Sequence, residues 1–264
     1  MPQFLVFTLA APMASFGGLA VGERRPSGNR PTKSQIVGFI SSALGITRSE
    51  EERQRALAGS LGYAVRVAEA GVPASDFHTA QRAEDASIRK RVRSHGPLAT
   101  RRDELACDSL KTVLSMREYR TGFLGTVVVW LRHEGPATLD DMRRGLVSPA
   151  FVPFVGRKAF PLMLPCQPLL KTAETIEAAL IGYDATRYET ERSEHLRDFE
   201  ARFLADRLPR RDTRPVLYAD ADAAIASPTQ HVVSRRDQPE TRAKWGFGLR
   251  SERVVPLDEG EDRQ

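Results

Sequence analysis

QFLVFTLA, at residues 3–10, is a short and nearly continuous apolar run, and Pro12 follows it closely. A strand at the centre of a sheet has this composition, because both of its faces are covered and neither meets water. We therefore predict a buried first strand over residues 3–10 that ends at Pro12. No basic segment precedes the run and Thr8 interrupts it, which argues against a signal peptide.

The next segment carries the clearest helix signal of the chain. Thr32 and Gln35 have the spacing of a capping box, apolar residues then recur at helical spacing, and Gly45 suits the position after the last turn. The free N–H groups at a helix start attract anions, and Arg30 and Lys33 flank this one. The segment is therefore either an anion site or an ordinary capped helix.

The remaining elements are expected in an order typical of an α+β domain. They are a helix from Ser49, capped by Glu52, to about Gly59, a strand at 61–67 with one face inward, a buried strand at 126–131, a helix at 138–146 with Leu139, Met142 and Leu146 inward, a helix at 172–181 and a strand at 214–219. This order suggests a ferredoxin-like or RRM-like domain, in which two helices cover one face of an antiparallel sheet.

Two segments depart from this pattern. Residues 76–111 have little apolar periodicity and much arginine, so we expect an insertion there in the form of a long hairpin. After Pro149 prolines multiply, and we expect an irregular C-terminal extension over about 150–264 with a frayed acidic end from Asp258. The whole chain, residues 1–264, is then a single domain.

The composition excludes several classes of protein. Hydrophobic residues make up 41% of the 264 residues and charged residues 28%, which allows a packed core without metals or disulfides. Cys107 and Cys166 are too isolated for a disulfide framework or a zinc site, so we expect a reduced, cytoplasmic protein. No apolar run is long enough to span a membrane. The net charge of +5 leans towards a polyanionic partner.

The positive charge is concentrated in two places. One window, residues 86–102, lacks Asp and Glu and carries Arg89, Lys90, Arg91, Arg93, Arg101 and Arg102. A second cluster, offset only by Glu23, comprises Arg24, Arg25, Arg30 and Lys33. Guanidinium groups clamp phosphate oxygens with two hydrogen bonds, so both segments suit phosphate contacts. The alternative is a pair of solvated basic loops.

Only one histidine lies in a sequence context that suggests chemistry. A metal-free ribonuclease needs a base and an acid. His78 could supply one role and His95, Lys90 or Tyr119 the other, but the remaining histidines are scattered. A structural or RNA-contacting role for His78 is therefore favoured, and none of the common nucleotide-binding or hydrolase motifs occurs. The aromatic residues that could stack on bases, or belong to the core, are Phe160, Trp245 and Phe247.

A series of short motifs runs through most of the chain. They are LAAPMASFG (9–17), RPTKS (30–34), LGI (44–46), YAVRV (63–67), DFHT (76–79), LACD (105–108), FVGRK (154–158) and RDQP (236–239). Together and in this order they resemble the CasD family, the fifth Cas protein of the RAMP superfamily, in its type I-E form. Phe16 stands where that family usually has tryptophan, and residues 171–228 match it poorly.

The resemblance implies an RRM-like RAMP domain with an arginine-rich β-hairpin thumb inserted at about 76–111. It also implies a non-catalytic subunit of the Cascade effector complex that binds crRNA and caps its 5′ handle. Such a subunit lies between the backbone filament and the large subunit and meets target DNA indirectly. The handle-contact residues carried over by position are Met13, Arg25, Arg30, Thr32, Lys33, Ser34, His78, Arg101, Arg102, Gly156, Arg157 and Lys158.

Two alternatives stay open at this point. Type I-C relatives of the family cut the CRISPR repeat themselves as metal-independent endoribonucleases. A general single-strand RNA-binding module of RRM type is the other alternative, because unstacked bases and backbone groups are what such domains contact. We expect no cofactor, no metal, no membrane contact and no homo-oligomer.

Overall fold

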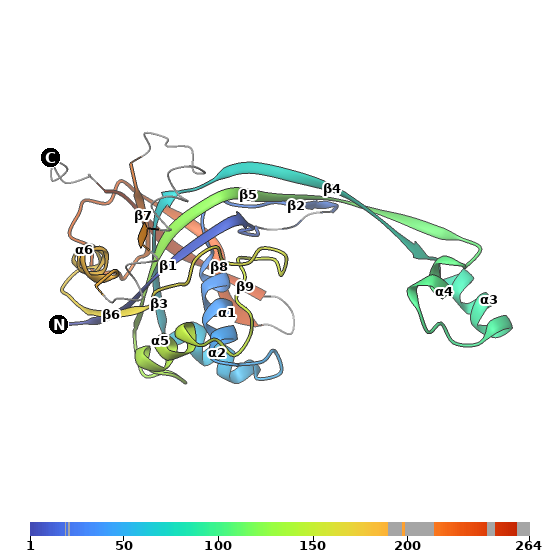
Figure 1. Cartoon of the computed structure of the whole chain (residues 1–264), viewed down its shortest axis with the longest axis horizontal. Coiled ribbons are helices and arrows are strands. Elements are labelled where there is room, and N and C mark those ends of the chain that lie inside the picture. Colours follow the sequence, from blue (N-terminus) through green and yellow to red (C-terminus); the bar gives the residue numbers. More distant parts are fainter. Residues whose placement is uncertain (19, 21, 190–196, 199–213, 242–245, 258–264) are drawn as a thin grey trace.

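One large, mostly antiparallel sheet organises this mixed α/β chain (Figure 1). The computed structural model describes residues 1–18, 20, 22–189, 197–198, 214–241 and 246–257. Its strands are β1 (Gln3–Ala14), β2 (Arg24–Arg25), β3 (Leu61–Glu69), β4 (Val72–Ala83), β5 (Leu110–Leu131), β6 (Leu169–Thr172), β7 (Val216–Asp220), β8 (His231–Thr241) and β9 (Gly246–Pro256). Its helices are α1 (Lys33–Ala43), α2 (Glu51–Ser60), α3 (Asp85–His95), α4 (Arg101–Leu105), α5 (Leu139–Val147) and α6 (Ile176–Thr186). Within these residues the strand order is β6-β1-β5-β3-β7-β9-β8, and β2 and β4 also pair with β5.

The first strand is central and buried, as its composition predicts, but it does not end at Pro12. β1 pairs with β5 up to Ala14. Away from β5, the Thr8 N–H donates to Cys166 and the Ala10 carbonyl accepts from Met163. Backbone groups alternate in direction along a strand, so the Pro12 nitrogen faces the same outer side as those of Thr8 and Ala10. Because Pro12 has no N–H on the side facing away from β5, the pairing of β1 with β5 loses no hydrogen bond.

Two hydrophobic clusters cover the two faces of the sheet. One joins the sheet to α1, α2 and α5, and the other joins it to α6 and the end of β9. β3 contributes to both, because Tyr63 and Val65 belong to the first and Ala64 to the second. The expectation of one inward face on this strand is therefore wrong: β5 and β7 flank β3, and packed elements cover both faces.

Local sequence signals, a capping box in one case and apolar spacing in the other, place two of the helices correctly. The Thr32 side chain accepts from the Gln35 N–H while the Gln35 side chain accepts from the Thr32 N–H, which is the predicted capping box of α1. Gly45 follows α1 with φ at +73°, as expected of the residue after a helix. α5 has the same reciprocal cap and buries Leu139, Met142 and Leu146, as predicted.

Two other helix starts are displaced from the predicted positions. α2 begins at Glu51 and not at Ser49, because residues 47–50 form a turn in which the Glu50 N–H donates to the Thr47 carbonyl. Thr47 donates to Glu50 through both its N–H and its hydroxyl. α6 begins at Ile176 rather than at residue 172, since residues 169–172 form β6 beside β1.

The arginine-rich insertion forms a long arm that projects from the body (Figure 1). β4 pairs with β5 from Val72 opposite Thr121 to Ala83 opposite Leu110. α3 and α4 form the tip, so the arginine-rich window is helical and not part of the strands. Its charge is partly offset, because Lys90 pairs with Asp108 at 2.7 Å. Strand β5 thus extends far beyond the predicted 126–131.

The expectation of an irregular C-terminal extension is wrong in part, because residues 148–168 contain no helix or strand but the later described residues form α6 and four strands. β6, β7, β8 and β9 all join the sheet, and β7 coincides with the predicted strand at 214–219. β8 and β9 lack an apolar run because they bury charged groups, including Asp237 and Glu252. The polar tail from Asp258 lies outside the described residues.

A buried ion cluster joins these strands to the start of α1. The Asp220 carboxylate accepts from Lys33 Nζ at 2.9 Å, from Arg250 at 2.9 Å and from Arg132 at 2.6 Å. It also accepts from the Tyr63 backbone N–H. Burial lowers the pKa of Lys33, although Asp220 opposes that shift. The Asp220 carboxylate of β7 therefore contacts α1, β3, β9 and the residue that follows β5.

Asp220→Ala should destabilise the fold by about 3–5 kcal/mol, because three buried cations would be left without their common partner. Asp222→Ala is the matched control. Asp222 also pairs with Arg132, but its side chain is 48% exposed against 2% for Asp220, so it should cost less than about 1 kcal/mol. Urea unfolding of both variants measures the difference. Equal destabilisation by the two variants would contradict a central role for Asp220.

Candidate nucleic-acid interface

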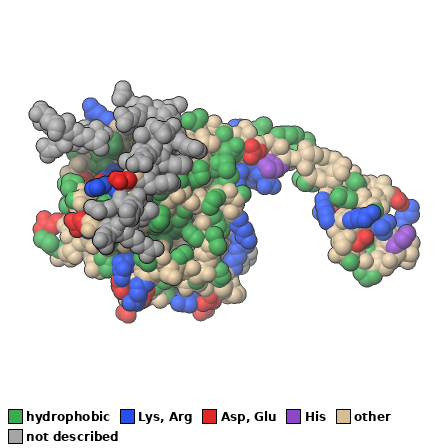
Figure 2. All heavy atoms as spheres, viewed as in Figure 1, with side chains coloured by type: hydrophobic (Ala, Val, Ile, Leu, Met, Phe, Trp, Pro, Cys, Tyr) green, Lys and Arg blue, Asp and Glu red, His purple; other side chains and the backbone are tan. Residues whose placement is uncertain are grey.

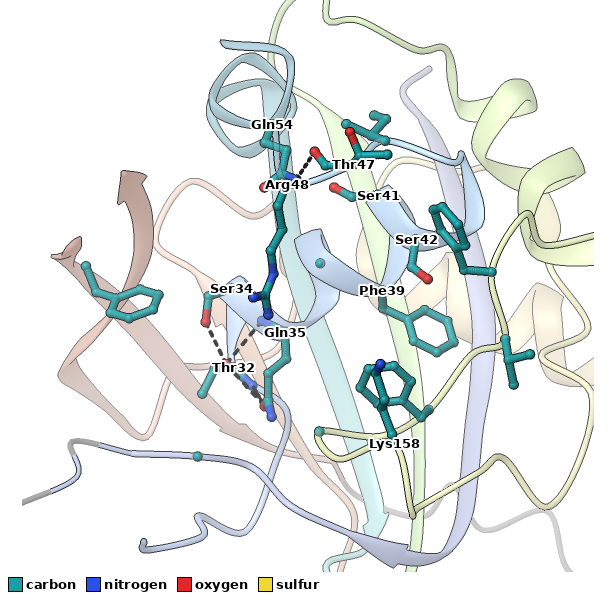
Figure 3. A pocket seen from close by; sticks show the side chains of 18 of the residues that line it. Thr32, Ser34, Gln35, Phe39, Ser41, Ser42, Thr47, Arg48, Gln54 and Lys158 are labelled. Carbon is teal, nitrogen blue, oxygen red and sulfur yellow. Dashed lines mark hydrogen bonds between the residues drawn. The ribbon is translucent and has the colours of Figure 1, made fainter. Parts of the chain in front are cut away.

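An open cleft of about 970 Å³ runs along the outward face of α1. The loop after β1, the loop before α2, the loop at residues 151–158 and the start of β9 form its other walls (Figure 3). Its lining residues are Gly17, Gly18, Thr32, Ser34, Gln35, Gly38, Phe39, Ser41, Ser42, Ile46, Thr47, Arg48, Gln54, Phe151, Val152, Phe154, Gly156, Lys158 and Phe247.

The chemistry of this lining suits a single nucleic-acid strand. None of these lining residues is acidic, and hydroxyl and amide side chains alternate with aromatic rings. Lys158 and Arg48 add positive charge, and Phe151 is half exposed. Unstacked bases bind aromatic faces while polar groups and cations hold the backbone, so this mixture is typical of single-strand binding.

Gly156 joins the walls of the cleft at one close contact. Its φ is +87°, and a Cβ atom there would stand 1.9 Å from the Ser15 carbonyl oxygen. That same oxygen accepts from Gln35 Nε2 at 2.6 Å, and the Ser15 N–H donates to Val155. Only glycine allows the loop, the end of β1 and the first turn of α1 to approach this closely.

A smaller pocket of about 320 Å³ shares Gly17, Gly18, Gln35 and Gly156 with the cleft. Three guanidinium groups line it, from Arg25, Arg117 and Arg157, and no carboxylate does. Arg157 donates to the Glu118 carbonyl at 2.7 Å, which fixes its direction. Burial, and then the nearby charge of Arg117, lower the pKa of Arg157. An anion entering this arginine pocket would relieve that repulsion.

The predicted anion site at the start of α1 is already filled from within the protein. Asp237 accepts the Lys33 N–H at 3.0 Å, and the Lys33 side chain is buried against Asp220. Arg30 pairs with Glu252 and lies 3.8 Å over the Tyr218 ring. Lys33 and Arg30 therefore hold the fold together, in contrast to the expectation that they contact RNA.

The other predicted residues of the body lie at or near the cleft. Thr32, Ser34, Gly156 and Lys158 line it, and Arg25 and Arg157 line the arginine pocket. Met13 is half buried in β1, opposite Thr121 of β5. Of the aromatic candidates, Phe247 lines the cleft and Phe160 is buried, whereas Trp245 lies outside the described residues.

The remaining predicted residues lie on the arm, away from the cleft. Exposed His78 lies on β4, with Nε2 3.7 Å from an Asp76 oxygen, and Tyr119 donates to that same carboxylate. Arg101 at the tip pairs with Glu104. Arg102 is exposed, and no ion pair of its side chain is found within the described residues.

Sequence reasoning missed three polar residues that line the cleft away from its Thr32 end. Ser41, Ser42 and Gln54 lie on α1 and α2, where such side chains normally face solvent. Arg117 was missed because it lies in the long strand β5 and not in a basic run. The periodicity of α1 does contain a signal, since Ser41 is a hydroxyl residue at the edge of its buried apolar face.

The sequence matches the family described as CRISPR-associated protein (Cas_Cas5) over residues 4–251, nearly the whole chain. The chain belongs to this family. It is 28% identical over 184 residues to the CRISPR system Cascade subunit CasD of Escherichia coli K12, which covers 70% of this chain and 78% of that relative. The match agrees with the resemblance seen in the motif series.

Solved structures show the same fold as this Cas5-family chain. One is a chain of a CRISPR RNA-guided surveillance complex, with a TM-score of 0.58, 22% identity and coverage of 96% of this chain and 90% of that one. Another is the crystal structure of a Cas protein, with a TM-score of 0.54, 20% identity and coverage of 96% and 95%.

The part of the chain that the structure describes contains neither a metal-binding cluster nor a membrane-spanning helix. Among its residues, no group of three or more His, Cys, Asp or Glu side chains is placed to hold a metal ion. No helix in the same part of the chain combines the length and the apolar character needed to cross a membrane. Cys107 and Cys166 are both free and buried, and burial raises the pKa of Cys166 to about 12.

Gly156→Ala should destabilise this Cas5-family protein by more than about 1 kcal/mol, because a Cβ atom there would meet a backbone oxygen at a positive φ. Gly17→Ala is the control from the same cleft. No atom lies within 4 Å of its added Cβ, so its effect should stay within about 0.5 kcal/mol. Chemical denaturation compares the two. A neutral Gly156→Ala would contradict the close approach.

Replacing Arg25 and Arg117 by Gln should reduce the salt dependence of RNA binding. Each phosphate that the protein no longer neutralises should lower the slope of log affinity against log salt by about 0.7. Arg53→Gln with Arg55→Gln is the control, because both arginines are exposed on α2 and outside the two pockets. Fluorescence polarisation over a salt series measures the slopes. An unchanged slope in the first variant would exclude the arginine pocket as a phosphate site.

Proposed function

We propose that this chain is a non-catalytic subunit of a cytoplasmic type I-E Cascade effector complex and binds the 5′ handle of the guide RNA. The observation that carries the proposal is the acid-free cleft, which shares its rim with a pocket of three arginines. Membership of the family and the likeness to a Cascade subunit support the same role.

The two pockets suggest how a single strand would lie. A phosphate in the arginine pocket would meet Arg25, Arg117 and Arg157 at once, and the adjoining nucleotides would enter the cleft across the shared glycines. Glycine at 17, 18 and 156 leaves room for close backbone approach. Hydroxyl and amide groups along α1 would then meet base edges and ribose 2′-hydroxyls, and the 2′-hydroxyls distinguish RNA from DNA.

We further propose that the body of the fold is a ferredoxin-like RAMP domain. β1 and β5 lie side by side at the centre, β3 lies beyond β5 and β6 lies beyond β1. The connection from β1 to β3 passes through α1 and α2, and that from β5 to β6 passes through α5. Two interlocked strand-helix-strand units of this kind make the βαββαβ arrangement.

The arm is proposed to act as the thumb of this domain. It projects from the body (Figure 2), and Arg89, Arg93 and Arg102 are exposed at its tip. A basic arm of this kind can follow the guide RNA away from the handle, where the backbone subunit and the large subunit would meet it. Contact with target DNA would be indirect.

Co-purification from cells tests the proposal. The tagged chain, expressed with its neighbouring genes and a repeat array, should recover a large complex whose RNA has uniform 5′ ends carrying a short repeat-derived segment. Sequencing of the bound RNA ends is the measurement. Diverse cellular RNA on a free monomer would instead favour a general single-strand RNA-binding module.

Ribonuclease activity is the alternative function, because the candidate acid and base residues lie on the arm. Asp76, His78 and Tyr119 lie close together on it, whereas His95 and Lys90 lie at the distant tip. We expect no cleavage, because the Tyr119 hydroxyl already donates a hydrogen bond to Asp76. Burial, and secondly the charge of Asp76, raise the pKa of Tyr119. The purified chain with repeat RNA in EDTA should leave the RNA intact. A discrete cut that His78→Ala abolishes would establish the enzyme instead.

A further inference from the structure

Two polar atoms at the far end of the cleft have no hydrogen-bond partner within the described residues. They are Ser41 Oγ and Gln54 Oε1, and the two residues are only 3% and 6% exposed. Both residues line the cleft, at the end away from Thr32 (Figure 3). A buried polar atom without a partner is unfavourable, so it marks a place where a ligand group can bind.

The orientation of the Gln54 amide is fixed by its neighbour. Its Nε2 donates to the Thr47 carbonyl at 2.6 Å, and Thr47 is held in turn by Glu50. Turning the amide over would set two carbonyl oxygens against each other. Gln54 therefore presents an acceptor, and what fills this end of the cleft must bring an N–H or O–H donor.

The surroundings favour a flat and partly apolar ligand. Ile46 is a buried apolar residue next to Thr47, and the rings of Phe39, Phe151 and Phe154 line the same cleft. Ser41 supplies a hydroxyl that can donate or accept. A nucleobase combines a stackable face with an edge that has an N–H donor beside an acceptor, which matches this set of groups.

We infer that Ser41 and Gln54 form a subsite that receives one unstacked nucleobase of the bound RNA and hydrogen-bonds its edge. The inference rests on the proposed function and deepens it, since it assigns base recognition to α1 and α2 and leaves the phosphates to the arginine pocket. The subsite would fix which nucleotide of the strand lies at this point, and hence the register of the strand in the cleft.

Ser41→Ala separates this role from a structural one. The Ser41 hydroxyl makes no hydrogen bond within the described residues, so its removal should leave the melting temperature unchanged or raise it. The affinity of the variant for RNA should nevertheless fall, because the hydrogen bond to the base in the subsite would be lost. Ser49→Ala is the matched control, because Ser49 lies in the adjoining loop and does not line the cleft. Gln54→Leu removes the acceptor and gives a second variant.

The test is an abasic scan by fluorescence polarisation with the full chain. The probe is the repeat-derived 5′ segment of its guide RNA, with the base removed at one position at a time. Wild type and Ser49→Ala should bind about tenfold more weakly when the base is missing at one position, as expected for one stacked and bonded base. Ser41→Ala and Gln54→Leu should bind the intact probe more weakly and no longer distinguish that position.

The outcomes separate the subsite from the proposed function. Tight binding of the intact probe with no position-specific effect, or an unaltered profile in Ser41→Ala, would overturn the subsite and leave handle binding in place. Equal binding of the probe and a scrambled RNA of the same length would overturn both.

Discussion

One buried carboxylate, that of Asp220, is the contact on which the arrangement of helix and sheet depends. It meets Lys33 of α1, Arg132 after β5 and Arg250 of β9, and it also accepts the backbone N–H of Tyr63 in β3. A buried charge is tolerated only when partners surround it, so these elements have little freedom to shift relative to one another. The start of α1 is thereby fixed against β7–β9, with its remaining face along the cleft.

The same ion cluster also holds acidic side chains in the interior, away from the surface of the cleft. Asp237 and Glu252 are held inside, where they neutralise Arg250, Arg235 and Arg30. Because acidic groups are buried with internal cations, the cleft and the arginine pocket keep a lining without carboxylates. A polyanion approaching this face therefore meets a lining of positive and neutral groups, which favours binding of a phosphate backbone.

Local signals explain how much of the fold and the site could be predicted. The capping box at Thr32 joins residues three apart, so a short stretch of sequence suffices to find it. The buried run of β1 and the inward face of α5 are equally local. Ser34, Gly156 and Lys158 were found through motifs and do line the cleft. Arg30 and Lys33 come from the same motif but turn inward, because their partners lie about 190 to 220 residues further along the chain.

The sequence by itself determined the order of β1, α1, α2, β3, the second half of β5 and α5, the basic arm as an insertion and the family of the protein. The elements depend on periodicity and caps within short windows, and the family depends on a series of short motifs along the chain. Only the tertiary structure decided that the charged strands β8 and β9 belong to the sheet, which cations are buried, and that Ser41 and Gln54 meet in one cleft. The reason is physical: a charge or hydroxyl is exposed or buried according to the partners that folding brings to it from distant positions, and no local pattern records those partners.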